Sequence, residues 1–412
     1  MNALFSYLNT GRINDIINAL LKTNHTDSIT SIDDEIKLSA LTSCLDLSTK
    51  SFDQMLANNS PVLRTIKGHA FEVAFEQIMT ANNISVKDVG GDTDIDLVVN
   101  GHELQLKTPN MAGTNALQVE YKTHKTHGAK SEMESMDYYH KVSDFAEFFV
   151  GLISYNPFKV FIVPKNQLPT HPSDNRYIKS PFQLPINGIY KQYINAFHLL
   201  GINIKNNPHI TSDINKELLP LTSSAIGGLN TSIILNTILR SNNFRIWDMS
   251  IRGFAREIAI EEMLSRYHIQ FSRTPNNYRA NRGDKADLVL IKNNKYTFVQ
   301  VKGISTNNCS FNGTRSVIAT ETQLTRGRCN DHPTQSRLYL NTDFSHLILA
   351  VDPPINYLIS KTAEWAFFYI PTSDLRKYPT LPHRINPIQK FDWNKLQEYR
   401  LTPSNYQTKL ES

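Results

Sequence analysis

The sequence is poor in cysteine and has no long apolar run. Its three cysteines, Cys44, Cys309 and Cys329, form no CxxC pair, so we expect no disulfide framework. No stretch of about 18 apolar residues is present that would cross a bilayer as a helix. The N-terminus also lacks the basic start and apolar core of a secretory signal. These absences predict a cytoplasmic protein without a transmembrane helix.

Neither sign of charge dominates the composition. The net charge is +5 over 412 residues, which permits a nucleic-acid partner but is shared by many soluble proteins with other partners. With 40% hydrophobic and 20% charged residues, each half of the chain can bury a core of its own. Composition therefore excludes a disordered or fibrous protein and leaves the function open.

The chain contains the same pattern twice. Matching segments recur in unchanged order: Ile17-Asn18-Ala19 with Ile194-Asn195-Ala196, Leu41-Thr42-Ser43 with Leu221-Thr222-Ser223, and Asp144-Phe145 with Asp343-Phe344. The offset grows gradually, as loop insertions would make it grow. We therefore predict a tandem duplication of a unit of about 200 residues, with the boundary between the copies near Pro185.

Each copy begins with helical patterns. Amphipathic stretches, with apolar residues three and four positions apart, occur at 13–21, 36–45, 193–200 and 218–221. Ser48 and Asn230 are suited to cap one further short helix in each copy. Longer helices are predicted over about 62–80 and 249–267. The segment 33–56 also has the spacing of a helix-turn-helix, although a plain helical bundle is the commoner explanation.

Strand patterns follow the long helix in each copy. The predicted strands are 96–99, 104–107, 148–153 and 160–163 in copy one, and 287–290, 298–302, 347–351 and 365–370 in copy two. The first two strands of each copy are predicted to form a hairpin, closed by Asn100-Gly101 in copy one. This order predicts an α/β fold in each copy, with a mixed central sheet flanked by helices. The predicted segments are a helical subdomain at 1–60, an α/β domain at 61–186, a second helical subdomain at 187–245 and a second α/β domain at 246–412.

One set of polar residues occurs at corresponding places in both copies: a helical Glu, an Asp that begins a strand, and Gln-x-Lys on the next strand. The residues are Glu72, Asp96, Gln105 and Lys107 in copy one, and Glu257, Asp287, Gln300 and Lys302 in copy two. Strand alternation places the Gln and the Lys of each copy on one face. Carboxylate and amide oxygens suit Mg²⁺, and a lysine beside them can orient or deprotonate a water molecule. The set suits phosphodiester hydrolysis; the alternative is a buried ion network that stabilises each sheet.

This set resembles the PD-(D/E)xK nuclease superfamily, which includes type II restriction endonucleases. The resemblance covers the helical Gly-x-x-x-Glu motifs, the hairpins, and the later strands that end in Val163-Pro164 and Ile370-Pro371. It implies a restriction-endonuclease-like fold in each copy, with Mg²⁺, for which Mn²⁺ can substitute. The implied metal ligands are Glu72, Asp96 and Gln105 in copy one, and Glu257, Asp287 and Gln300 in copy two. Lys107 and Lys302 would serve the attacking water.

Two features of the set leave alternatives open. Both copies have Gln where the family most often has Glu or Asp, a variant that occurs in methyl-directed restriction nucleases. Because an amide binds metal more weakly than a carboxylate, the helical Glu would carry more of the ligation. Asp94 lies two residues before Asp96, so either could be the ligand, although only Asp96 matches Asp287 before Leu-Val.

Basic segments follow the Gln-x-Lys of each copy. We expect their residues to contact DNA, although a solvated loop face is nearly as good an explanation; they are Lys122, His124, Lys125 and His127 in copy one, and Arg315, Arg326 and Arg328 in copy two. Since the two segments differ, we expect an asymmetric recognition sequence.

The sequence therefore predicts a Mg²⁺-dependent DNA endonuclease, a type II restriction enzyme that works as a single-chain pseudodimer. A monomer with internal pseudo-two-fold symmetry would bind double-stranded DNA and cut one strand with each active site. The resemblance also implies a cognate DNA methyltransferase. The alternatives are a nicking nuclease with only one active copy, and a non-catalytic nucleic-acid-binding protein whose sites are relics.

Overall fold

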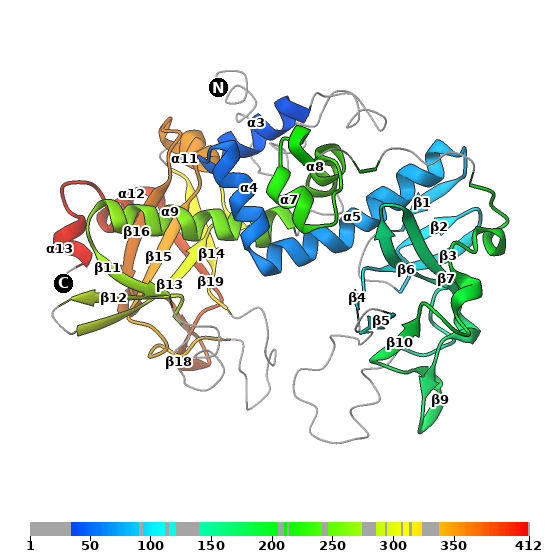
Figure 1. The fold of residues 1–412 in the computed structure, drawn as a ribbon. Helices are drawn as coiled ribbons and strands as arrows, with labels where there is room; N and C mark the ends of the chain where they lie inside the picture. The colour runs from blue at the N-terminus through cyan, green and yellow to red at the C-terminus, as the bar shows by residue number, and fades with distance from the viewer. Residues whose placement is uncertain are drawn as a thin grey trace. The chain divides into compact units, whose positions relative to one another are not determined.

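The structure is a computed structural model, and it describes residues 34–89, 94–111, 115–120, 140–204, 210–211, 214–240, 246–273, 286–292, 295–305, 308–312, 315–323 and 338–410 (Figure 1). The chain divides into two compact units. The first unit is formed mainly by Thr49–Ser250, and the second mainly by Ile251–Ser412 together with Ile36–Ser48. No helix within these described ranges is long and apolar enough to span a bilayer.

Each unit is built around a five-stranded mixed sheet. The first sheet has the order β1 (Val86–Asp88), β2 (Leu97–Val99), β3 (His102–Lys107), β6 (Phe148–Tyr155), β7 (Phe158–Pro164). The second has the order β11 (Gln270–Arg273), β12 (Leu288–Lys292), β13 (Lys295–Gly303), β15 (His346–Val351), β16 (Ala366–Pro371). In both sheets the third and fourth strands are parallel and the other neighbours are antiparallel. The two copies therefore share strand order and direction, and the predicted mixed α/β architecture is confirmed.

The predicted strands all occur in these sheets, whereas the edge strands β1 and β11 were not predicted. Both edge strands are short and mostly polar, so neither carries the apolar run or strict alternation of a half-buried strand. The hairpin turn between β2 and β3 has φ values of 51° at Asn100 and 87° at Gly101. Positive φ at both central residues is the geometry that Asn-Gly favours in a two-residue hairpin.

A long helix packs on each sheet. Helix α5 (Ser60–Ala81) contacts β1 and β3, and α9 (Arg252–Arg266) contacts β11 and β13. In the second unit Ile260 and Leu264 of α9 share a core with Val299 and Val301 of β13. In the first unit Phe149 belongs to a core shared with β5 (Ala116–Val119) and β10 (Phe182–Pro185), which form a small sheet with β4 (Asn110–Met111). The first sheet therefore packs against a small β-structure as well as the predicted flanking helix.

Shorter helices account for most of the predicted helical patterns. They are α3 (Asp34–Leu45), α4 (Thr49–Asn58), α7 (Pro220–Ala225) and α8 (Thr231–Leu239). The Asn230 side chain caps α8 by accepting a hydrogen bond of 2.9 Å from the backbone N of Ile233. The stretch 13–21 lies outside the described residues.

The helix predicted over 193–200 is wrong, because only the 3₁₀ turns η5 (Lys191–Tyr193) and η6 (Phe197–Leu200) form there. Asn195 interrupts the segment with a φ of 51°. Its backbone N donates to the carbonyl of Val160 at 2.8 Å, and its Oδ1 accepts from the backbone N of Val160 at 3.0 Å. Pairing with the edge of β7 therefore replaces the helical hydrogen bonds.

The division of the helices between the two units differs from the division of the sequence into two repeats. Helices α7 and α8, which come from the predicted second helical subdomain, pack in the first unit against α4 and α5. The Asp53 carboxylate of α4 accepts hydrogen bonds of 2.9 Å from the backbone N atoms of Leu221 and Thr222. Most of α3 belongs to the second unit, where the Leu45 carbonyl accepts a hydrogen bond of 3.1 Å from Trp365 Nε1.

The remaining elements are short. They are η4 (Lys165–Gln167), β8 (Thr170–His171), β9 (Asp174–Ile178), η7 (Ile214–Lys216), the π-helical turn η9 (Ile246–Ile251), β14 (Val317–Glu321), α11 (Pro353–Ser360), η11 (Thr372–Asp374), β17 (Lys377–Tyr378), β18 (Leu381–Ile385), β19 (Ile388–Asp392), α12 (Trp393–Leu396), η12 (Gln397–Tyr399) and α13 (Tyr406–Leu410).

Candidate active site

In the first unit, the predicted Asp and Gln lie in direct contact. Asp96 immediately precedes β2, and Gln105 lies on the neighbouring strand β3. Gln105 Nε2 donates a hydrogen bond of 2.6 Å to Asp96 Oδ2, and the backbone N of Leu106 donates one of 2.7 Å to the same oxygen. The carboxylate is thus held against the strand that carries Lys107.

The second unit repeats this arrangement. Asp287 immediately precedes β12, and its Oδ2 accepts a hydrogen bond from Gln300 Nε2 on β13. The same oxygen accepts a hydrogen bond of 3.0 Å from the backbone N of Val301. Each copy therefore uses one carboxylate oxygen, one glutamine amide and the backbone N–H between the Gln and the Lys in the same way.

The glutamine oxygens are the unusual feature of both sites. Gln105 is 1% exposed and Gln300 is 2% exposed, and within the described part of the chain Oε1 of each has no hydrogen-bond partner. A buried polar atom without a partner costs about 1–3 kcal/mol. A purely structural network would be expected to satisfy both oxygens. Because the Nε2 of each amide contacts the Asp, the orphaned oxygen of the same group lies beside that carboxylate.

Charges around Asp96 link the other predicted residues of copy one to this site. Burial raises the pKa of Asp96 to about 6, the Lys107 ammonium lowers it, and the Glu72 carboxylate raises it. Glu72 Oε2 lies 3.2 Å from Nδ1 of His69, three residues earlier on α5. The structure thus places Glu72 and Lys107 within electrostatic range of Asp96.

Asp94, the alternative ligand, has a different partner. Its Oδ2 lies 2.7 Å from His140 Nδ1, and the His140 side chain is 10% exposed. Asp96, by contrast, makes the same hydrogen bonds as Asp287. The arrangement common to the two copies therefore includes Asp96 and leaves Asp94 outside it.

In the second unit, Glu257 and Lys302 have partners that the sequence did not indicate. Glu257 Oε2 lies 3.3 Å from Nη1 of Arg273 on β11, and Arg273 also pairs with Glu261. The Lys302 ammonium lies 5.5 Å from the centroid of the Tyr339 ring, within cation–π range. The sequence does contain one signal for the Arg273 pairs, because a second Glu follows the helical Glu by four residues in both copies and would attract a cation to this part of the helix.

The residues expected to contact DNA are mostly outside the described part of the chain. Only Arg315 is described. It is exposed just before β14, and its backbone N donates to the carbonyl of Asn312 at 3.0 Å. The predictions that lie outside the described residues are Lys122, His124, Lys125, His127, Arg326 and Arg328.

The donor set of each site fits Mg²⁺ in chemical type, because carboxylate and amide oxygens are hard ligands. Among the described residues no group of three or more His, Cys, Asp or Glu side chains could hold a metal ion. Each predicted set has only two carboxylates, so the orphaned glutamine oxygen and water would have to complete the coordination. The orphaned oxygen is the observation that makes such a set chemically reasonable.

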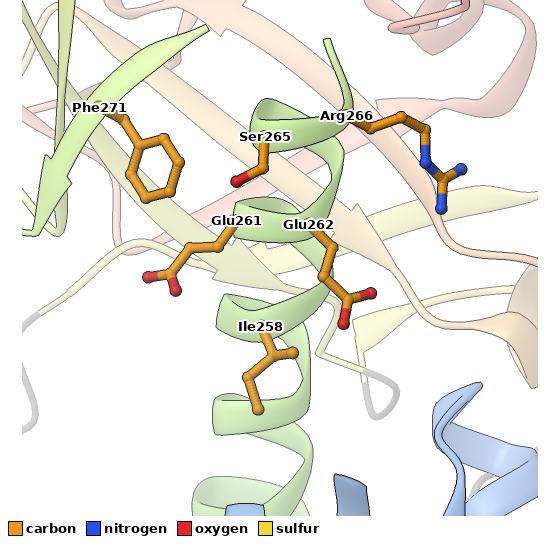
Figure 2. A pocket seen from close by; sticks show the side chains of 6 residues that line it. All are labelled: Ile258, Glu261, Glu262, Ser265, Arg266 and Phe271. Atoms are coloured by element: carbon orange, nitrogen blue, oxygen red, sulfur yellow. The ribbon is translucent and has the colours of Figure 1, made fainter. Parts of the chain in front are cut away.

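A shallow hollow lies on α9 beyond Glu257. Figure 2 shows the side chains that line it, which are Ile258, Glu261, Glu262, Ser265, Arg266 and Phe271. None of the predicted catalytic residues lines this hollow.

No family model matches the sequence, and no curated protein is similar to it at a significant level. The functional argument therefore depends on the repeated site itself.

Proposed function

We propose that the chain is a Mg²⁺-dependent DNA endonuclease of the type II restriction class, with one restriction-endonuclease-like site in each unit. The observation that carries the proposal is the repeated site, in which the Asp and Gln of each copy make matching hydrogen bonds and each Gln leaves one buried oxygen unpaired. A stabilising ion network would explain a carboxylate near a lysine. It does not explain the same unsatisfied oxygen in both copies.

In this proposal Glu72, Asp96 and Gln105 hold one Mg²⁺, and Glu257, Asp287 and Gln300 hold the other. The bound ion supplies Lewis acidity and lowers the pKa of water. The hydrogen bonds from Gln105 Nε2 and Leu106 N fix Asp96 Oδ2, which leaves Oδ1 and the glutamine oxygen to face the ion. Lys107 and Lys302 orient the attacking water and stabilise charge that develops on the phosphate.

The duplication suits a double-stranded substrate. Two hydrolyses are needed to cut a duplex, and a chain with two sites can supply both without forming a homodimer. The proposed partners are double-stranded DNA, which a monomer would bind, and a cognate DNA methyltransferase that protects the host sequence. A cytoplasmic location follows from that substrate.

The test is cleavage of supercoiled plasmid DNA with Mg²⁺, with Mn²⁺ and with EDTA. Metal-dependent linear product supports the proposal. Open circles alone at saturating metal would show that one copy is active, and tight binding without cleavage would show that the sites are relics. The Lys107→Ala, Lys302→Ala double variant is the control for contaminating nuclease, and a structured RNA substrate tests whether DNA is the preferred substrate.

A further inference from the structure

Each long helix carries two glutamates one turn apart, and each pair is countered by an arginine from a different element. In the first unit Arg240, at the end of α8, pairs with Glu76 of α5 and lies 3.5 Å from Asp88 of β1. In the second unit Arg273 of β11 pairs with both Glu257 and Glu261 of α9. The predicted metal ligand Glu257 is therefore in a direct ion pair with Arg273, whereas Glu72 pairs with His69 and interacts with Arg240 through its charge.

Sheet register shows that the charge at one position is reversed between the units. Asp88 is opposite Leu97 at the start of β2, and Arg273 is opposite the equivalent Leu288 at the start of β12. In the first unit three carboxylates surround the Arg240 guanidinium. Glu76 and Asp88 pair with it directly. Burial lowers the pKa of Arg240, and the nearby charge of Glu72 raises it. The second unit has two carboxylates, from Glu257 and Glu261, around the Arg273 guanidinium.

The second unit has a further cation beside its Gln-x-Lys strand. Arg256 precedes Glu257, and its guanidinium lies so close to Gly303 that a Cβ at this glycine would clash with Nη2. The equivalent of Arg256 in the first unit is Phe71, which is fully buried and packs edge to face with Phe75. The surroundings of the second site are therefore more positive than those of the first.

We infer that the two units bind a divalent cation with unequal affinity, tightly in the first and weakly in the second, and that Arg273 causes much of the difference. The inference rests on the proposed function of these residues. The buried and unpaired Oε1 atoms of Gln105 and Gln300 independently indicate a cation at each site. A fixed guanidinium paired with Glu257 repels an incoming dication and competes with it for the carboxylate.

The difference in affinity should be about tenfold. A guanidinium a few ångströms from a dication is repelled appreciably even in water, but Arg273 is half exposed, which screens the interaction. At limiting metal the chain would nick only the strand served by the first unit. Cleavage of the second strand would require a higher metal concentration, so cleavage would be ordered.

The experiment is calorimetric titration of the full-length protein with Mn²⁺, without DNA. Wild-type protein should show two classes of site that differ about tenfold in Kd. Asp96→Asn should abolish the tight class and Asp287→Asn the weak class. Arg273→Gln should tighten the weak class about tenfold, and Arg273→Lys, which keeps the charge, should leave it weak. Arg176→Gln, which breaks the exposed Arg176–Asp174 pair in the first unit, is the matched control and should change neither class.

Two equal classes in the wild type, or a weak class that Arg273→Gln leaves unchanged, would overturn the inference. The absence of any Mn²⁺ binding by a folded protein would also overturn it. Circular dichroism of each variant establishes folding. Unequal binding that responds to Arg273→Gln, in a protein that cleaves no nucleic acid, would support the inference and refute the proposed function, so the two failures can be told apart.

Discussion

Asp96→Asn is expected to stabilise the metal-free protein at neutral pH. Burial raises the pKa of Asp96 from 3.8 to about 6, so ionisation of this carboxyl in the folded protein costs free energy of folding. At 1.36 kcal/mol for each pKa unit, the cost is about 3 kcal/mol when the group is ionised. Both hydrogen bonds to Asp96 end on Oδ2, so an asparagine with its oxygen in that position keeps both and removes the charge.

The effect should depend on pH in a defined direction. The native state retains the Asp96 proton up to about pH 6, while the unfolded chain releases it near 3.8. Between these values the native state binds more protons, so the wild-type free energy of unfolding falls as pH rises. The increase in free energy of unfolding caused by Asp96→Asn should therefore be near zero below pH 4 and reach its full value above pH 6.

Urea unfolding in EDTA at pH 4, 5, 6 and 7.5 measures this difference. Asp144 is exposed, and Asp144→Asn is the control. Its difference from the wild type in free energy of unfolding should stay nearly constant across this pH range. Added Mg²⁺ should stabilise the wild type more than Asp96→Asn, because the ion binds the folded state through the carboxylate. Equal stability of wild type and Asp96→Asn at pH 7.5 in EDTA would refute the reasoning.

Three further predictions concern the lysines, the glutamines and the packing between helices. Lys107→Ala and Lys302→Ala should each nick one strand of a plasmid, on opposite strands, and a single variant that linearises DNA at the wild-type rate would exclude independent sites. Gln105→Glu and Gln300→Glu should lower the Kd for Mn²⁺, since a carboxylate replaces the orphaned amide oxygen, and calorimetry would contradict this by showing weaker binding. Asp53→Ala removes the buried acceptor for the backbone N atoms of Leu221 and Thr222 and should lower the free energy of unfolding by about 2–3 kcal/mol in urea, whereas a loss below about 0.5 kcal/mol would show that these hydrogen bonds do not hold α7 in place.

Local patterns were enough to predict the elements that position the site. The apolar runs before and after Gln105 and Gln300, and the helical spacing around Glu72 and Glu257, depend only on residues close in sequence. The candidate residues could also be chosen from the sequence, because duplication marks which polar residues recur. Their pairing was not predictable, since the bond from the Gln amide to the Asp follows from a register between strands.

What could not be predicted depends on residues distant in the sequence. Asn195 disrupts a helical pattern because it pairs with the edge of β7 at Val160, which its neighbours in sequence do not indicate. Periodicity shows that α7 and α8 have an apolar face but does not show which helix covers it. The arginines that counter the helical glutamates were missed for the same reason, because Arg240 and Arg273 come from different elements of the two copies.

Each unit contains a helix from the other repeat, and this determines when the packing of each unit can be completed during synthesis. The packing around α5 is incomplete until α8 has left the ribosome, because α8 belongs to the second repeat and packs against α5. Helix α3 is made before either sheet, yet the Leu45 carbonyl pairs with Trp365, near the end of the chain. A gene cut at the repeat boundary would yield two fragments that each lack a partner helix. Co-expression of such fragments, rather than either one alone, should recover soluble protein.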